Sequence, residues 1–272
     1  MDMEIRTLEI EGRKTAFKPE QTNNIYLLVR GRQAVLVDGC YDHEQARMLI
    51  AEELRGLTLT DILVTHFHPD HAESAARIRR ETGATLWAHP YEVNVGPFVK
   101  KDEIDRELSD GLIIETGAGI PVRAVGTPGH TMGHTCFLLE ERGVLFTGDH
   151  VIGEGTSWVG PPHGSIAEYM RSLEKLRGLD LKEIRGGHGP LVSDPQAKVT
   201  EYYDHRMMRE RQILDVLKDS PASIAELVER IYGNTIGERI RPLAAQVMKG
   251  HLDKLDAEGA VRAEGTGRWS RT

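Results

Sequence analysis

The most restrictive feature of this sequence is the run Thr65-His66-Phe67-His68-Pro69-Asp70-His71, which places three histidines and an aspartate directly after an apolar segment. The apolar segment, residues 61–64, has the composition of a short buried strand. Alternation along an extended chain sends His66 and His68 to one side, and a turn at Pro69 lets Asp70 and His71 fold back. Burying these groups together is costly without a cation, so the run predicts a metal site.

Three later segments repeat this placement of a metal-binding side chain after a predicted strand. His130, Asp149 and His188 each stand in a glycine-bearing turn. Strand ends of α/β proteins meet at one edge of a sheet, so these side chains are expected to converge with the first run. The alternative, unrelated core or solvated histidines, is disfavoured because clustered histidine and carboxylate groups are what zinc selects.

Hydrophobic patterns divide the chain into two regions. Up to about residue 190, strand patterns and helix patterns alternate, beginning with a hairpin over residues 24–39, which predicts a layered α/β domain with a mixed sheet over residues 1–197. Beyond Pro195 the pattern is helical at 199–217, 223–231 and 239–255, and a hairpin follows at 260–270. Ser223 and Glu226 fit a capping box. Residues 198–272 are therefore predicted to form a winged-helix-like domain.

Composition limits the classes of partner. The net charge is −8, and residues 198–272 carry thirteen basic and twelve acidic side chains, so residues 1–197 carry −9. An acidic field of this size disfavours the long-range attraction of polyanions.

No stretch approaches the ~20 apolar residues of a membrane span, and the first residues lack a signal-peptide pattern, so a cytoplasmic protein without a membrane partner is expected. Cys40 and Cys136 are expected to be small buried side chains.

The histidine and aspartate pattern resembles the metallo-β-lactamase superfamily, whose signature is a His-x-His-x-Asp-His box followed by a distant His, Asp and His. The resemblance implies an αββα metallo-β-lactamase sandwich that precedes the C-terminal winged-helix-like domain. It implies that His66, His68 and His130 hold one metal, that Asp70, His71 and His188 hold the other, and that Asp149 bridges them. Two zinc ions are expected, with iron or manganese as alternatives. Asp38 resembles the superfamily's first motif, where the aspartate supports the ligand loops through hydrogen bonds and is not a ligand.

Other segments resemble the β-lactamase-like protein 2 family, which joins such a catalytic domain to a C-terminal winged-helix-like domain. They are residues 153–156, 169–173, 187–190 and 205–214, so the likeness spans nearly the whole chain. Known activity in that family includes cleavage of single-stranded RNA, and related proteins in biosynthetic clusters cleave thioesters. The resemblance therefore constrains the chemistry more than the substrate.

These observations predict a dinuclear metal-dependent hydrolase with a metal-bridging hydroxide as nucleophile, oriented by Asp70. An ester, thioester or lactone carbonyl of a small molecule is the expected target. Trp158 and His163, in a Gly- and Pro-rich loop, are candidates for substrate contact.

Two alternatives and the oligomeric state stay open. The first alternative is a single-stranded RNA endoribonuclease that uses the same site, with Arg206, Arg209 and Arg211 as backbone contacts, although such a cluster on a helix more often forms a solvated face. The second, a DNA-binding regulator, is weakened because acidic residues interrupt the basic ones of the third helix. A homodimer is a further expectation.

Overall fold

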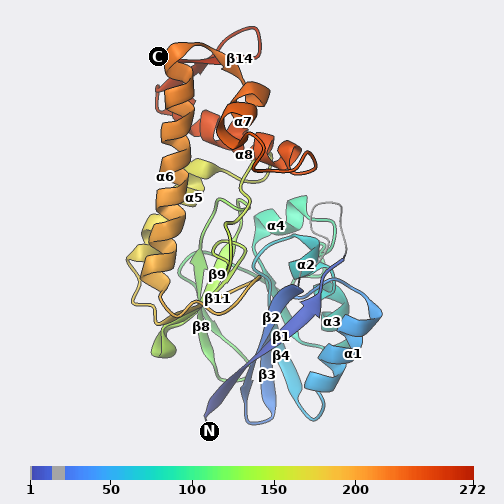
Figure 1. Cartoon of the computed structure of the whole chain (residues 1–272). Helices are drawn as coiled ribbons and strands as arrows, with labels where there is room; N and C mark the ends of the chain where they lie inside the picture. Colours follow the sequence, from blue (N-terminus) through green and yellow to red (C-terminus); the bar gives the residue numbers. More distant parts are fainter. Residues whose placement is uncertain (1, 14–21) are drawn as a thin grey trace. The chain divides into compact units, whose positions relative to one another are not determined.

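The computed structural model describes residues 2–13 and 22–272, which form two compact units (Figure 1). Unit 1 consists of Met1–Thr127, Gly133–Gly155 and Asp180–Pro195. Unit 2 consists of Pro128–Met132, Thr156–Leu179 and Gln196–Thr272. Two segments from the middle of the chain, 128–132 and 156–179, therefore pack with the C-terminal helices.

Unit 1 is built on two sheets. The six-stranded sheet has its strands in sequence order, antiparallel from β1 to β3 and parallel from β3 to β6. Its strands are β1 (Met3–Glu11), β2 (Thr22–Arg30), β3 (Gln33–Val37), β4 (Thr58–Leu63), β5 (Thr85–Ala88) and β6 (Arg106–Glu107). The five-stranded sheet has the order β11-β10-β9-β8-β7, and only its β10–β11 pair is parallel. Its strands are β7 (Ile113–Glu115), β8 (Pro121–Gly126), β9 (Thr135–Leu139), β10 (Val144–Gly148) and β11 (Glu183–Gly186).

Alternating apolar side chains explain how the sheets pack. On β2, Leu28 faces the second sheet and joins a buried cluster with Phe137 and Phe146, whereas Leu27 faces a separate cluster with helical residues such as Ile50 and Ile78. The helices on this outer side include α1 (Glu44–Glu53) and α3 (Ala75–Thr82), as Figure 1 shows. Short helices α2 (Pro69–Ala72) and α4 (Pro90–Val95) and a 3₁₀ turn, η1 (Glu140–Arg142), complete the unit. Unit 1 thus has helix, sheet and sheet layers.

Unit 2 has its own apolar core. Leu227, Met248, Leu252 and Trp269 are buried together in it. The elements are α5 (Ile166–Arg177), α6 (Pro195–Asp219), β12 (Ala222–Ser223), α7 (Ile224–Tyr232), α8 (Arg241–Ala257), β13 (Val261–Ala263) and β14 (Arg268–Arg271). The three short strands form one antiparallel sheet in the order β12-β14-β13. Helices followed by this hairpin give the winged-helix arrangement that the sequence predicts.

Most predicted elements agree with the structure, and the differences have local causes. The long C-terminal helix begins at Pro195, before the predicted residue 199, and α8 begins at Arg241 with Pro242 in its first turn. Proline suits the first turn because its missing N–H has no helical partner there. The capping box of Ser223 and Glu226 is present. The short helix α4 was not predicted because it is too brief to show a helical period.

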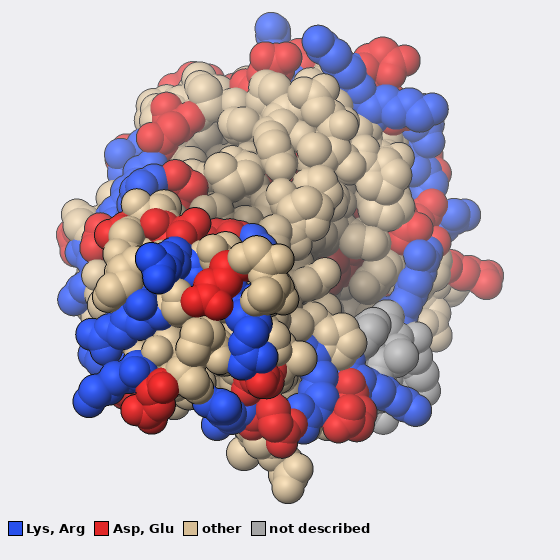
Figure 2. Space-filling view, turned by 90° about the horizontal axis from the view of Figure 1, so that it is seen from above, with Lys and Arg blue, Asp and Glu red and all other residues tan. Residues whose placement is uncertain are grey.

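The surface carries mixed charge. On the face that Figure 2 shows, basic and acidic side chains are interspersed. Lys249 pairs with Asp253 and Lys254 with Glu258 on α8, and Arg241 pairs with Glu229. Among the described residues, no helix combines the length and the apolar character that crossing a membrane requires. Both cysteines are buried and unbridged, as expected.

Candidate metal centre

Four loops at strand ends present the residues that the sequence singled out. The first loop follows β4 and carries His66 and His68, and it leads into α2, which carries Asp70 and His71. The loop between β8 and β9 carries His130, and both its ends lie in unit 1, where Thr127 N–H donates to the His134 carbonyl at 2.9 Å. Asp149 and His188 follow β10 and β11, which are parallel neighbours, so both strand ends lie at the same edge of the sheet.

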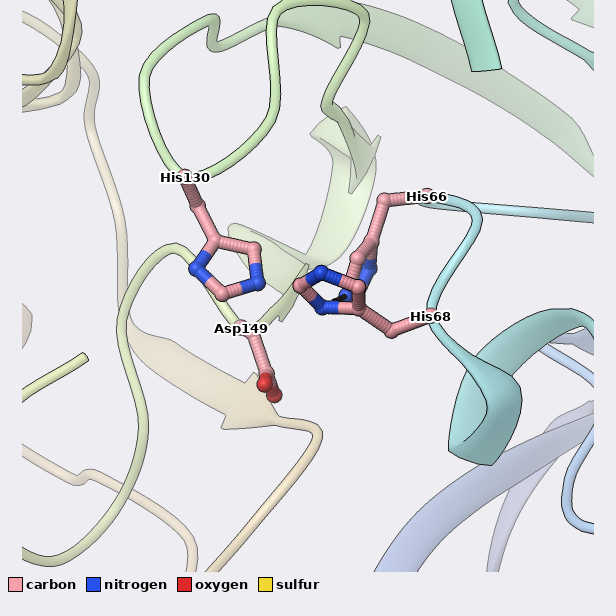
Figure 3. Close-up of side chains that lie close together, drawn as sticks. All are labelled: His66, His68, His130 and Asp149. Atoms are coloured by element: carbon pink, nitrogen blue, oxygen red, sulfur yellow. Dashed lines mark hydrogen bonds between the residues drawn. The ribbon is translucent and has the colours of Figure 1, made fainter. Parts of the chain in front are cut away.

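Four of these side chains form a first group of potential metal ligands. His66, His68, His130 and Asp149 each offer a ligand atom, and these atoms lie within 4.8 Å of one another (Figure 3). Nε2 of His66 and Nδ1 of His68 are 2.9 Å apart. His66 and His130 are buried, and His68 and Asp149 are partly buried.

A second group consists of Asp70, His71 and His188, whose ligand atoms also lie within 4.8 Å of one another. Asp149 Oδ1 is 3.3 Å from Nε2 of both His71 and His188, so this carboxylate contacts the second group as well as the first. A side chain at Gly187 would overlap the ring of His71, since its Cβ would lie 2.4 Å from Cε1. The glycine before His188 is therefore required by the close approach of the two loops.

Asp38 holds the first loop and one imidazole together. It is buried, and its Oδ1 accepts the backbone N–H of Thr65 at 2.7 Å. Its Oδ2 accepts the Thr65 hydroxyl at 2.9 Å and Nδ1 of His71 at 2.8 Å. Because the Thr65 hydroxyl proton is used in this way, the Thr65 oxygen is the acceptor for Nδ1 of His66, 3.0 Å away.

Backbone carbonyls orient the imidazoles of His130 and His188 in a similar way. Nδ1 of His188 is 2.8 Å from the carbonyl of Thr22, and Nδ1 of His130 is 2.7 Å from the carbonyl of Trp158. Carbonyl oxygens only accept, so both Nδ1 atoms carry the hydrogen. His66, His71, His130 and His188 therefore share the Nδ1–H tautomer, which leaves a lone pair on each Nε2.

Buried carboxylates dominate the electrostatics of the centre. Burial alone would lower the pKa of His188, but the charge of Asp149 raises it to about 9. Burial would raise the pKa of Asp70, but the charges of His71 and His188 lower it to about 2. Against burial, the charges of His188 and His71 hold the pKa of Asp149 well below its usual range. The site thus favours positive charge, which protons or metal ions supply.

The donor set fits divalent metal ions. Within residues 2–13 and 22–272, the buried Nε2 atoms of His71 and His188 make no hydrogen bond, although Asp149 Oδ1 is 3.3 Å from each. Lone pairs that face carboxylate oxygens repel them unless a cation lies between them. Imidazole and carboxylate groups together suit zinc, iron and manganese.

Glu92 is a site residue that the sequence did not reveal. It is buried on α4, and it accepts the backbone N–H of Phe67 at 2.9 Å and that of Gly133 at 2.8 Å. Phe67 stands between His66 and His68, and Gly133 ends the loop of His130. Glu92 therefore connects two ligand loops. Phe67 and Gly133 contact it through backbone amides distant in the chain, so no motif marks it.

Most of the arginines that were candidates for contacts with an RNA backbone are not exposed on the surface. Arg206 and Arg209 are buried, and only Arg211 of the three is exposed. Arg206 donates to the Ser157 carbonyl and stacks over Tyr169, and Arg209 stacks over Tyr232. The expectation of phosphate contacts or of a solvated face is therefore wrong for Arg206 and Arg209.

The two substrate-contact candidates lie in unit 2. Trp158 is partly buried, and its carbonyl accepts a hydrogen bond from Nδ1 of His130. His163 is partly exposed in the loop that precedes α5. Their contact with a substrate stays a prediction.

Comparison with known proteins identifies the family. Residues 19–188 match the metallo-beta-lactamase superfamily. The chain belongs to this superfamily. Residues 223–269 match the beta-lactamase associated winged helix domain, so the superfamily fold and its C-terminal module were both correctly predicted.

Relatives within the superfamily extend the match over nearly the whole chain. An atrochrysone carboxyl ACP thioesterase from Aspergillus fumigatus is 31% identical, with 94% of this chain and 82% of that protein covered. A beta-lactamase-like protein 2 homolog from Drosophila melanogaster is also 31% identical, with 89% and 85% covered. The crystal structure of a metallo-beta-lactamase family protein from Thermus thermophilus covers 98% of both chains, with 26% identity and a TM-score of 0.80. The protein is a hydrolase, and its His/Asp cluster fits divalent metal binding.

Proposed function

We propose that the protein is a dinuclear metal-dependent hydrolase that cleaves an ester, thioester or lactone carbonyl of a small molecule. The observation that carries this proposal is the pair of ligand groups with Asp149 in contact with both. His66, His68, His130 and Asp149 would hold one metal, and Asp70, His71 and His188 would hold the other, together with Asp149. Zinc is the metal we propose, with iron and manganese as alternatives.

Two metal ions in this centre would lower the pKa of a bound water, so that hydroxide is available near neutral pH. The protein side chains supply the remaining requirements. Asp38 and the Thr22 and Trp158 carbonyls keep the imidazoles in the tautomer that leaves Nε2 available. Asp70, partly buried with Oδ2 3.3 Å from Nε2 of His188, would accept a hydrogen bond from the attacking water and orient it.

A thioester is the preferred target within this class. The support is the name of the Aspergillus fumigatus relative, an acyl-carrier-protein thioesterase. Against RNA cleavage, two of the three arginines proposed as backbone contacts are buried. A cytoplasmic location and a homodimer stay predictions, which cell fractionation and light scattering would test.

The test combines metal analysis with a substrate panel. Purified protein is assayed for metal content and for hydrolysis of acyl thioesters, lactones, simple esters and labelled single-stranded RNA, before and after chelation and metal return. We expect close to two metals per chain and carbonyl hydrolysis that is lost on chelation and recovered with zinc. Full activity of protein stripped of metal would refute the metal mechanism, and turnover of RNA alone would refute the substrate class.

A further inference from the structure

The imidazole of His130 depends for its orientation on residues 157–158, which belong to the same unit 2. Nδ1 of His130 is 2.7 Å from the carbonyl of Trp158 and 3.2 Å from Oγ of Ser157. Ser157 is buried, so this contact is shielded from water. Any shift of residues 157–158 would therefore rotate the His130 ring or remove the acceptor that sets its tautomer.

Arg206, on the C-terminal helix α6, holds residues 157–158 in place. Its guanidinium donates to the carbonyl of Ser157 and stacks over the ring of Tyr169, 5.2 Å from the ring centroid. Arg206 is only 3% exposed. Burying a guanidinium is costly unless its donors and its charge are satisfied, so this arrangement is specific rather than incidental.

Tyr169 in turn packs against the loop of His130. A side chain at Gly129 would place its Cβ 2.3 Å from Cα of Tyr169, and Gly129 has a φ of 142°. Only glycine fits this close approach. The loop of His130, helix α5 and Arg206 therefore form one packed arrangement within unit 2.

A second C-terminal helix holds the same segment. Nε1 of Trp158 donates to the carbonyl of Leu243 on α8 at 3.4 Å. Gly160 lies against the backbone of Gln246, which would be 3.1 Å from a Cβ at this glycine. Residues 157–160 are thus held by α6 and by α8, and they hold His130.

We propose that Arg206 is a positioning residue for metal binding: it holds Ser157 and Trp158, and through them it holds His130 in its ligand orientation. This inference rests on the proposed function, because it takes His130 to be a ligand. It gives the C-terminal helices a role in the metal centre although they contribute no ligand. It also explains why a basic residue of α6 is turned inward.

The test uses metal affinity as its main readout. Arg206→Met keeps the length and packing of the side chain but removes its donors, and Arg206→Lys keeps the charge. Arg211→Met, at an exposed position on the same helix, is the matched control. Zinc affinity is measured by competition with a chromophoric chelator, and the ligand field by the absorption spectrum of the cobalt-substituted protein.

We expect Arg206→Met to weaken binding of one of the two metals by about 10–100-fold, the usual effect of removing a residue that supports a ligand. Its cobalt spectrum should change, Arg206→Lys should recover part of the affinity, and Arg211→Met should match the parent protein. Trp158→Phe, which loses the indole donor to α8, should weaken the same metal and provides a test if Arg206→Met does not fold.

Parental affinity and an unchanged cobalt spectrum in folded Arg206→Met would overturn the inference and leave the proposed function intact. If Arg206→Met is unfolded, parental affinity in both Trp158→Phe and Arg206→Lys would overturn it. A parent protein that binds no metal would instead overturn the proposed function, and the inference with it.

Discussion

Nδ1 of His71 donates a hydrogen bond to Oδ2 of Asp38 at 2.8 Å, and both side chains are buried. Asp38 is the one non-glycine residue with positive φ among the described residues, at 65°. Its carboxylate accepts three hydrogen bonds and donates none, so it imposes the Nδ1–H tautomer on His71. Asparagine tolerates the same backbone conformation and has nearly the same volume, which makes it a precise probe of this role.

We therefore expect Asp38→Asn to fold but to bind metal poorly. Its amide group presents two donors where the carboxylate accepted, so it favours the His71 tautomer that carries hydrogen on Nε2. Metal affinity of the group of Asp70, His71 and His188 should fall by about 10–100-fold, and turnover should fall with it. Metal titration and kcat measurements check this, and a variant with parental metal content and kcat would contradict the role of Asp38.

Asp149→Ala should lose metal and activity, whereas His134→Ala should lose stability and keep its metal. Asp149 contacts both ligand groups, so its loss should remove metal and activity. His134 is buried, contacts Thr127 Oγ1 at 2.9 Å and lies with its ring 5.2 Å from that of His66. Its removal should lower stability by about 1–3 kcal/mol while metal content is retained. Metal analysis and urea unfolding of both variants test this, and equal metal loss in the two would show that the ligand assignment is wrong.

Glu92→Gln should damage the metal centre although Glu92 is not a ligand. Glutamine offers one acceptor to two amide donors, those of Phe67 and Gly133, and its own amide group opposes the second. Losing a hydrogen bond to a buried charge costs about 1.5–3 kcal/mol. We expect a lower melting temperature and weaker metal binding.

The matched control for Glu92 is Glu81→Gln, which breaks only a surface ion pair with Arg77. Such a pair contributes about 0–1 kcal/mol. Indistinguishable effects of the two substitutions would mean that Glu92 does not connect the ligand loops.

The clustering of the histidine and aspartate side chains could be predicted because each segment follows a strand that its own apolar residues reveal, and such strand ends meet at one edge. The supporting contacts could not be predicted in this way. Glu92 binds backbone amides, which are the same in every sequence, and Arg206 is buried because Tyr169 and the Ser157 carbonyl receive it. When the tertiary partners of a basic helix face are unknown, its side chains are expected to be solvated. The sequence alone therefore predicts solvent exposure for Arg206 and Arg209.

Acid should destabilise unit 2 through its buried His251. His251 on α8 is fully buried, with Nδ1 at 3.4 Å from Oε1 of Glu210 on α6. Burial, reinforced by the charges of Arg206 and Arg209 and opposed by Glu210, lowers the pKa of His251 to about 4. In the unfolded chain a histidine titrates near pH ~6.5, so between these values the unfolded chain binds a proton that the native protein does not. This contribution to the free energy of unfolding is present above pH ~6.5 and falls by about 3 kcal/mol as the pH drops toward 4.

His251→Gln cannot take up that proton, so its free energy of unfolding should fall less steeply between pH 6.5 and 4.5 than that of the parent protein. Parallel curves from urea unfolding of the two proteins across this range would show that His251 is not the group responsible.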